Sequence, residues 1–236
     1  MKEKVLDHYT FHIEKFYHQN NLILAEQTLS IDAAKWTCLI GPSGVGKTTL
    51  LRCIAGLQGK NKSDYSIGYM SQNDTLLPWL SALDNIVLGQ RLRHEKRDFD
   101  KALSILKELG LEKFSSFYPH QLSLGMRQRV ALARTLIENN DVILMDEPFA
   151  ALDAKTRRDV QNYALKTLKG KTVLLVTHDI GEVIRIADHV YLLKESPAKA
   201  IPIDLKEILS DSSTPRVTNC PQVWQRASSV LSSLYA

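Results

Sequence analysis

The sequence contains no apolar run long enough to cross a membrane. Its hydrophobic stretches stay well short of the ~20 residues that a membrane-spanning helix requires. Residues 1–19 are charged and lack an apolar centre, so we expect no signal peptide. If the protein works at a membrane, we expect a different chain to cross it.

Cysteine and excess charge are also scarce. The 236 residues include three cysteines, Cys38, Cys53 and Cys220, and none of them forms a CxxC pair. This favours a reducing cytoplasm over a disulfide framework. Lys plus Arg is 30 against 26 acidic residues, which gives a net charge of +4, and the charges are dispersed. Mild, dispersed basicity argues only weakly for nucleic acid or another polyanion as a partner.

Three short apolar runs lack the alternation of half-exposed strands. They cover residues 37–40, 142–145 and 172–176 and are rich in Val, Ile and Leu. Such runs are typical of strands buried on both faces of a parallel sheet. The sequence therefore predicts an α/β fold with a mostly parallel central sheet.

The pattern becomes helical between residues 81 and 137. There, apolar residues recur at helical spacing, and Gly110 follows one such stripe in the place of a helix C-cap. We predict one domain over residues 1–236 with a helical lobe at about 74–137. The Ser- and Pro-rich tail at about 200–236 allows a helix near 222–234, to which we attach no function.

A glycine-rich loop follows the first of these buried runs. The segment GPSGVGKTT fits the spacing GxxxxGK[ST]. Its glycines allow backbone N–H groups to turn inward at a helix start and form a nest for an anion. A lysine placed there can bridge the β- and γ-phosphates, and the threonine hydroxyl after it can bind Mg²⁺. We predict a nucleoside triphosphate site formed by Gly41, Pro42, Ser43, Gly44, Val45, Gly46, Lys47, Thr48 and Thr49.

Two acidic residues end the second buried run. Asp146 and Glu147 follow a predicted strand at the end where parallel sheets bind ligands. We expect Asp146 to hold magnesium through water and Glu147 to orient or deprotonate the water that attacks the γ-phosphate. An acidic pair after a strand is weak evidence for such a site by itself, but the phosphate loop about 100 residues upstream strengthens the prediction.

Two further polar residues follow other strands. His178 comes after the run at 172–176 and is a candidate sensor of the γ-phosphate. A histidine at such a point is more often a hydrogen-bonding residue at a helix start than a catalyst. Gln72 follows a shorter run, and taken alone it is a polar loop residue.

The motifs GPSGVGKTT, YMSQ, LSLGMRQRV, VILMDEP, ALD and THD occur in the order found in the ATP-binding cassette (ABC) ATPases of membrane transporters. Residues 10–195 resemble this family. The resemblance implies a P-loop NTPase fold with a small antiparallel β region. It also implies ATP and Mg²⁺ as cofactors, and a head-to-tail dimer in which each ATP lies between one copy's phosphate loop and the other copy's signature helix.

The resemblance also assigns roles to individual residues. Ser123 and Gly125 would contact the γ-phosphate of ATP bound to the second copy. Gln72 would bind magnesium, and Asp153 would lie in the loop that links the two ATP sites. Glu147, His178 and Lys47 would be the catalytic residues, with His178 as the switch histidine. Tyr17 is our choice for stacking on adenine. Phe16 remains an alternative, and so does an ordinary core position for Tyr17.

Within the family, the segments LLPWLSALDNI and IGEVIRIADHV resemble importer subunits of the nitrate, sulfonate, taurine and thiamine-precursor group. This implies transmembrane permease subunits as partners, an indirect link to a solute-binding protein, and a peripheral position on the cytoplasmic face of the cell membrane. Trp79 and Leu80 are candidates for contact with the permease. Buried packing is an equal alternative, and an exposed aromatic side chain would favour the interface.

The sequence departs from the family pattern at several points. Leu124 replaces the first signature glycine. If its backbone is helical, leucine fits; if it requires a positive φ, or a contact closer than a Cβ permits, the cost is ~1–2 kcal/mol. We expect weakened but surviving ATP sandwiching. Ala34 and Lys35 stand where a glycine usually precedes the first buried strand, and the region between Gly56 and Tyr65 is short, which predicts a smaller adenine-binding sheet. No appended regulatory module is expected.

Three other functions remain as alternatives. A soluble cassette ATPase acting on nucleic acid or ribosomes usually fuses two cassettes or inserts coiled coils, which this sequence lacks, so no nucleic acid is expected. A degenerate subunit is supported by Leu124 alone. An exporter ATPase is a further alternative, because direction is a property of the membrane chains.

Overall fold

The computed structural model describes residues 7–59, 64–194 and 197–204, and it divides the chain into two compact units. One unit is formed by the chain up to Ile67 and from Gly170 onward, and the other is Gly68–Lys169. Cys220 and the predicted helix near 222–234 lie outside the described residues. Within the described ranges, no helix is both long and apolar enough to span a bilayer.

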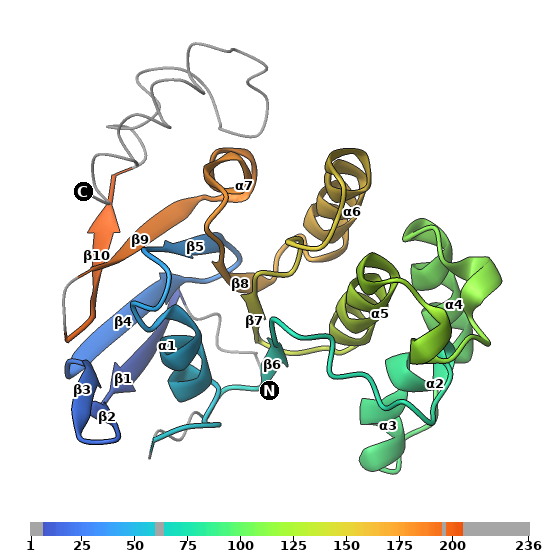
Figure 1. Cartoon of the computed structure of the whole chain (residues 1–236), viewed down its shortest axis with the longest axis horizontal. Coiled ribbons are helices and arrows are strands. Elements are labelled where there is room, and N and C mark those ends of the chain that lie inside the picture. Colours follow the sequence, from blue (N-terminus) through green and yellow to red (C-terminus); the bar gives the residue numbers. More distant parts are fainter. Residues whose placement is uncertain (1–6, 60–63, 195–196, 205–236) are drawn as a thin grey trace. The chain divides into compact units, whose positions relative to one another are not determined.

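The first unit contains a sheet with β5 (Trp36–Ile40) inside it (Figure 1). β5 pairs in parallel with β8 (Thr172–Val176) on one side and with β9 (His189–Lys194) on the other. β10 (Lys199–Ile203) pairs antiparallel with β9. Every residue of β5 and β8 is buried, so these strands follow the prediction from their unbroken apolar runs.

The same unit holds two antiparallel strand pairs. Burial alternates strictly along β4, as it does when a sheet has one face on the core and one outside. This is the small antiparallel region expected from the resemblance. The pairs are β1 (His8–Ile13) with β4 (Gln27–Asp32) and β2 (Phe16–His18) with β3 (Asn21–Leu24).

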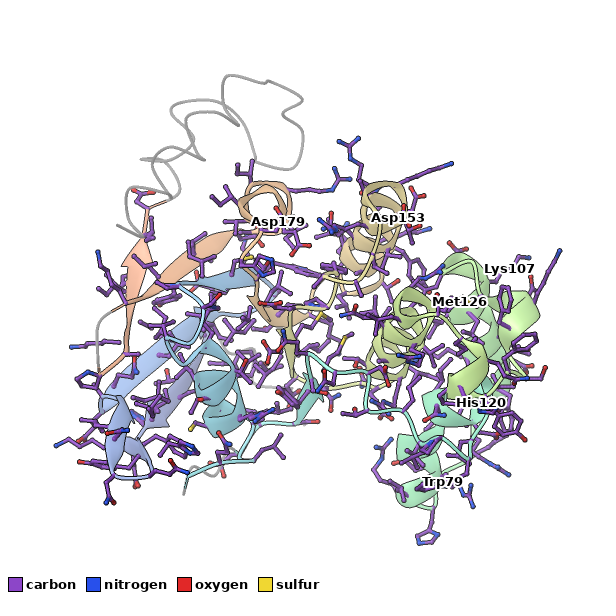
Figure 2. All side chains as sticks on the ribbon, viewed as in Figure 1. Trp79, Lys107, His120, Met126, Asp153 and Asp179 are labelled. Atoms are coloured by element: carbon purple, nitrogen blue, oxygen red, sulfur yellow. The ribbon has the colours of Figure 1, made fainter. Side chains whose placement is uncertain are left out.

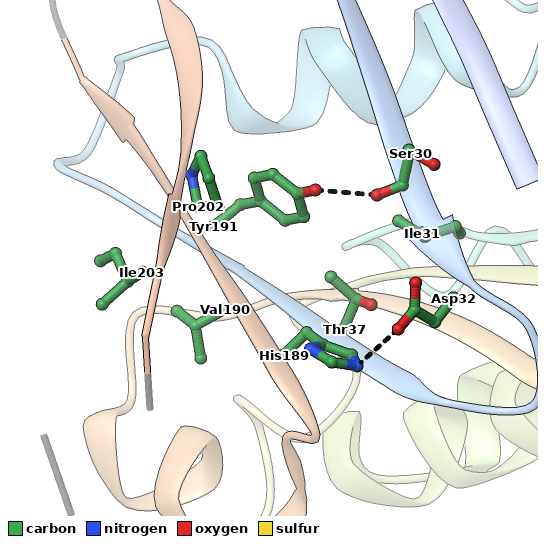
Figure 3. A pocket seen from close by; sticks show the side chains of 9 residues that line it. All are labelled: Ser30, Ile31, Asp32, Thr37, His189, Val190, Tyr191, Pro202 and Ile203. Carbon is green, nitrogen blue, oxygen red and sulfur yellow. Dashed lines mark hydrogen bonds and ion pairs between the residues drawn. The ribbon is translucent and has the colours of Figure 1, made fainter. Parts of the chain in front are cut away.

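Side chains of β9 connect β4 to the parallel sheet (Figure 3). The Tyr191 hydroxyl donates to the Ser30 carbonyl at 2.8 Å, and His189 Nε2 lies 3.0 Å from Asp32 Oδ2. Burial raises the pKa of Tyr191, and the nearby Asp32 carboxylate adds to the effect. The recess between these contacts has a volume of about 100 Å³. The contacts therefore fix the antiparallel region against β9.

The turn before β5 takes up a conformation that favours glycine, although no glycine is present. Ala34 has φ 57°, which costs about 1 kcal/mol in an L-residue compared with glycine. The Ala34 N–H donates to Thr172 Oγ1 at 2.9 Å, and the Trp36 N–H donates to Asp188 Oδ2 at 2.8 Å. These hydrogen bonds offset the strain, which explains how the departure from the family pattern is tolerated.

The second unit contains neighbouring strands β6 (Ile67–Met70) and β7 (Val142–Asp146) and a group of helices. α2 and α4 both pack on α5, and α5 also contacts α6 (Figure 1). Gly110 follows α4 with φ 69°, as predicted for a C-cap. The helices are α2 (Ala82–Ile86), α3 (Leu88–Leu92), α4 (Phe99–Glu108), α5 (Leu124–Leu136) and α6 (Ala154–Thr167), with 3₁₀ turns at Glu112–Phe114 and Pro119–Gln121.

Candidate functional site

The phosphate loop lies in the first unit, between the end of β5 and the start of α1 (Lys47–Ile54). Gly44 and Gly46 have φ 79° and 111°, in the left-handed region where side chains are strained. A Cβ at Gly41 would collide with the Leu193 carbonyl oxygen. The glycines of this segment are therefore required by its backbone path.

The start of α1 lacks a side-chain cap, which the start of α7 in the same unit has. Gly46 caps α1 without a side-chain hydrogen bond, whereas Asp179 caps α7 (Ile180–Ile186) by accepting from the Gly181 N–H at 2.7 Å. The amides at the start of α1 thus have no side-chain cap, which suits an anion. Lys47 Nζ donates to the carbonyls of Gly41 and Pro42, each at 2.7 Å, so it spans the loop.

His178 follows the strand next to the one that bears the phosphate loop. Because β5 and β8 are parallel, with Leu39 opposite Val176, both loops lie at the same edge of the sheet. His178 is exposed. Its neighbour Thr177 is buried and donates to Glu182 Oε2 at 2.7 Å, and this contact anchors the histidine loop on α7.

Tyr17 lies on β2 with 57% of its surface exposed, so it is not a core aromatic residue. Phe16 is half-buried, and the strand register shifts between the two residues. The exposed ring is the better candidate for stacking on a base, and that role remains a prediction.

In the second unit, Gln72 and Glu147 come together. Gln72 follows β6 and Glu147 follows β7, and Gln72 Nε2 donates to Glu147 Oε2 at 3.3 Å. Glu147 is half-buried and has φ 49°, a strained conformation for a residue with a side chain. Asp146, the last residue of β7, is 1% exposed. The strand ends of this unit thus gather both predicted carboxylates and the predicted glutamine.

The signature segment forms the start of α5. Ser123 is the N-cap, and its hydroxyl accepts from the Met126 N–H at 3.3 Å. Accepting this bond uses a lone pair, and the hydroxyl hydrogen can still donate to an anion. Leu124 is the first helical residue, does not have a positive φ and is 57% exposed. Backbone strain at Leu124 is therefore absent, and only close contact with a ligand remains as a reason for a weaker site.

Gly125 allows α5 to pack against the loop after Glu147. A Cβ at this position would lie 3.1 Å from the Ala151 carbonyl oxygen and 3.4 Å from Leu152 Cδ2. Asp153 ends this loop and caps α6 by accepting from the N–H groups of Lys155 and Thr156, both at 3.1 Å. Its hydrogen bonds to Thr156 lower the pKa of Asp153. Gly125 and Asp153 therefore have structural roles in addition to their predicted contacts with nucleotide.

Two arginines, for which the sequence predicts no partner, hold the segment after Gln72 against α5. Arg134 donates to the Asp74 carbonyl at 2.9 Å and to the Thr75 carbonyl at 3.1 Å. Arg127 Nε pairs with Asp74 Oδ2 at 2.9 Å. The helix that begins at the signature serine is thus tied to the glutamine loop. Sequence spacing gives no signal for these contacts, because about 60 residues separate Arg134 from its partners.

Comparison with known proteins decides the family. The ABC transporter family matches residues 24–150, more than half of the chain. This chain belongs to the ABC transporter family. Such an ABC ATPase hydrolyses ATP, and the predicted P-loop NTPase fold is confirmed by solved structures of the family.

Several ABC proteins are similar over most of their length. An uncharacterized ABC transporter ATP-binding protein of Bacillus subtilis, YtlC, is 44% identical over 73% of this chain and 74% of its own. The aliphatic sulfonates import ATP-binding protein SsuB 1 of Rhodococcus jostii is 42% identical over 75% and 76%. Among solved structures, the dimeric ATP-binding cassette MJ0796 bound to ADP and Pi has a TM-score of 0.70 at 29% identity, covering 80% of this chain and 99% of that one.

Replacing Leu124 in this ABC ATPase tests the remaining reason for a weaker site. Its Cβ leans towards the helix N-terminus, where an anion would sit. We expect Leu124→Ala and Leu124→Gly to strengthen ATP-dependent self-association equally, by up to about ten-fold, because bulk and not φ is at issue. Analytical ultracentrifugation against ATP concentration measures this. Stronger self-association with glycine alone would show that a positive φ is needed. Unchanged self-association in both variants would show that Leu124 does not weaken the site.

Proposed function

We propose that this chain is the ATP-hydrolysing subunit of a small-solute importer and that two copies close head to tail on ATP beneath a membrane permease. The observation that carries the proposal is the exposed start of α5, where Ser123 and Leu124 face out of the unit. A serine-capped helix start directed outward suits an anion carried by another molecule. The similarity to sulfonate import proteins supports the importer class.

The residues present fit ATP and magnesium. The uncapped start of α1, its positive-φ glycines and Lys47 suit a polyphosphate. Thr48, Gln72 and Asp146, the predicted magnesium ligands, carry oxygen atoms, which are the ligands that Mg²⁺ prefers. Among the described residues no cluster of three or more His, Cys, Asp or Glu side chains forms a metal site.

Each side chain has a defined part in the hydrolysis. When bound, ATP with magnesium supplies the terminal phosphoryl group and a cation that reduces its negative charge. Lys47 binds the phosphate oxygens, and Glu147 orients water and accepts its proton. Gln72 holds the Glu147 carboxylate through its amide nitrogen, and its amide oxygen is the atom suited to a cation. His178 contacts the terminal phosphate, and Ser123 of the second copy donates to it.

Trp79 is the side chain we assign to the permease. It is 69% exposed in the helical region after Gln72 and points outward (Figure 2), whereas Leu80 is half-buried. Tryptophan is one of the residue types enriched among those that carry most of the binding energy at interfaces. We place this surface at the cytoplasmic face of the cell membrane, with a solute-binding protein linked only through the permease.

Purification of the tagged chain from its own membranes in mild detergent tests this function. We expect a transmembrane chain to co-purify and Trp79→Ala to reduce its recovery by about ten-fold or more, as for a central interface residue. Leu92→Ala is the matched control, because Leu92 is 70% exposed in the same unit. Recovery of RNA with a steep salt dependence, and no membrane chain, would instead support the nucleic-acid alternative.

A further inference from the structure

Glu147 has a strained backbone just after the end of its strand. It follows the last residue of β7 and has φ 49°, which costs of the order of 1–3 kcal/mol for a residue with a side chain. Such a conformation persists only where neighbouring groups hold it. The Glu147 carbonyl accepts from the Ala150 N–H at a long 3.3 Å and from Gln128 Nε2 at 2.9 Å. The shorter of these contacts comes from a side chain of α5.

Gln128 also holds the loop that follows Glu147. Its Oε1 accepts from the Ala151 N–H at 3.1 Å, so both ends of one carboxamide are used. Gln128 is 5% exposed. A flipped amide would place two donors together and two acceptors together, and a buried amide without its partners is costly. The orientation of Gln128 is therefore fixed by two points of the backbone on either side of Pro148–Ala150.

We propose that Gln128 is a positioning residue, which sets the Glu147 carboxylate and the Ala151–Asp153 loop from the same helix that begins at Ser123. The inference rests on the proposed role of Glu147. Through Gln128, α5 then orients the catalytic carboxylate and the loop of its own copy. Through Ser123, the same helix contacts the nucleotide bound to the other copy. When the two copies close, α5 therefore links the Ser123 contact at one ATP site to the position of Glu147 at the other.

Gln128→Met tests the proposal because it keeps the length of the side chain and removes both hydrogen bonds. In full-length, nucleotide-free protein we expect amide hydrogen exchange at Ala151 to become about ten-fold faster, because one buried hydrogen bond is lost. At a concentration where wild-type turnover is measurable, we expect kcat to fall by about ten-fold or more and the Kd for Mg-ATP to change by less than about two-fold, because the phosphate loop is untouched.

Gln161→Met is the matched control, since Gln161 is a buried glutamine of α6 in the same unit, 3% exposed. It should leave both Ala151 exchange and kcat near wild type. Gln128→Glu separates the two contacts, because it keeps an acceptor for Ala151 and lacks the amide donor to Glu147. We expect it to preserve protection at Ala151 while kcat still falls, and it also serves if Gln128→Met does not fold.

Two kinetic results would overturn the proposal. One is wild-type kcat in folded Gln128→Met or Gln128→Glu, and the other is an equal loss of kcat in Gln161→Met. Ala151 exchange is measured without nucleotide, so it reports on Gln128 whether or not Glu147 proves to be the catalytic base. Unchanged Ala151 exchange in Gln128→Met would show that Gln128 does not protect this amide, and the proposal would then fail. Faster Ala151 exchange in Gln128→Met, together with normal turnover in Glu147→Gln, would instead count against the proposed function.

Discussion

Replacing Glu147 with glutamine should lower ATP turnover by about 10²–10⁴-fold, the contribution of a general base. Glutamine has the same shape and its amide oxygen can still accept from Gln72 Nε2, so the local contact at 3.3 Å is preserved. What is lost is the capacity to take a proton from water. ATP binding should remain within about two-fold of wild type, because Glu147 is not part of the phosphate loop.

Glu108→Gln is the control for this substitution. Glu108 is exposed at the end of α4 in the same unit, so the change removes the same charge from a different element. Phosphate release measured for both variants separates the loss of a base from the loss of a negative charge. Turnover in Glu147→Gln comparable to that of Glu108→Gln would mean that another group deprotonates the water.

Replacing Lys47 with alanine should weaken ATP binding by about ten- to 100-fold, the range for losing a hydrogen bond to a charged partner. Lys47 is 8% exposed and bonds to the Gly41 and Pro42 carbonyls, so its ammonium is already held across the loop. The substitution removes both the positive charge and the group that spans the loop. Isothermal titration with Mg-ATP measures the change.

Lys35→Ala provides the comparison for Lys47. Lys35 immediately precedes β5, whereas the phosphate loop follows it, so the same charge is removed at the opposite end of the strand. We expect its affinity for ATP to stay within about two-fold of wild type, since an exposed charge at that distance is screened. Equal affinities for Lys47→Ala and Lys35→Ala would show that Lys47 does not contact the nucleotide.

The sequence predicted those parts of the fold and site that depend on contiguous residues. The unbroken apolar runs identified β5, β7 and β8, because a strand buried on both faces carries its signal in a few neighbouring positions. The glycine spacing likewise located the loop before α1, whose positive φ values are what those glycines permit.

Contacts between distant segments could not be predicted in the same way. Gln128 lies 19 and 23 residues from the backbone groups it binds, and in the sequence it is one more polar residue of a helix. The geometry at Leu124 depends on whether α5 begins before or after it, and the Ser123 cap decides this. Exposure separates Tyr17 from Phe16, and the sequence alone does not show which of two neighbouring aromatic side chains faces outward.

The most direct test of the account is the mass of Glu147→Gln in solution, measured by light scattering with and without saturating Mg-ATP. We predict one chain without nucleotide and two chains with it, and we predict that adding Ser123→Arg returns the mass to one chain, because bulk at the start of α5 would block the second copy's phosphates. A mass of one chain under saturating Mg-ATP, both for the isolated protein and beside its permease, would contradict the head-to-tail pair and the transport function built on it.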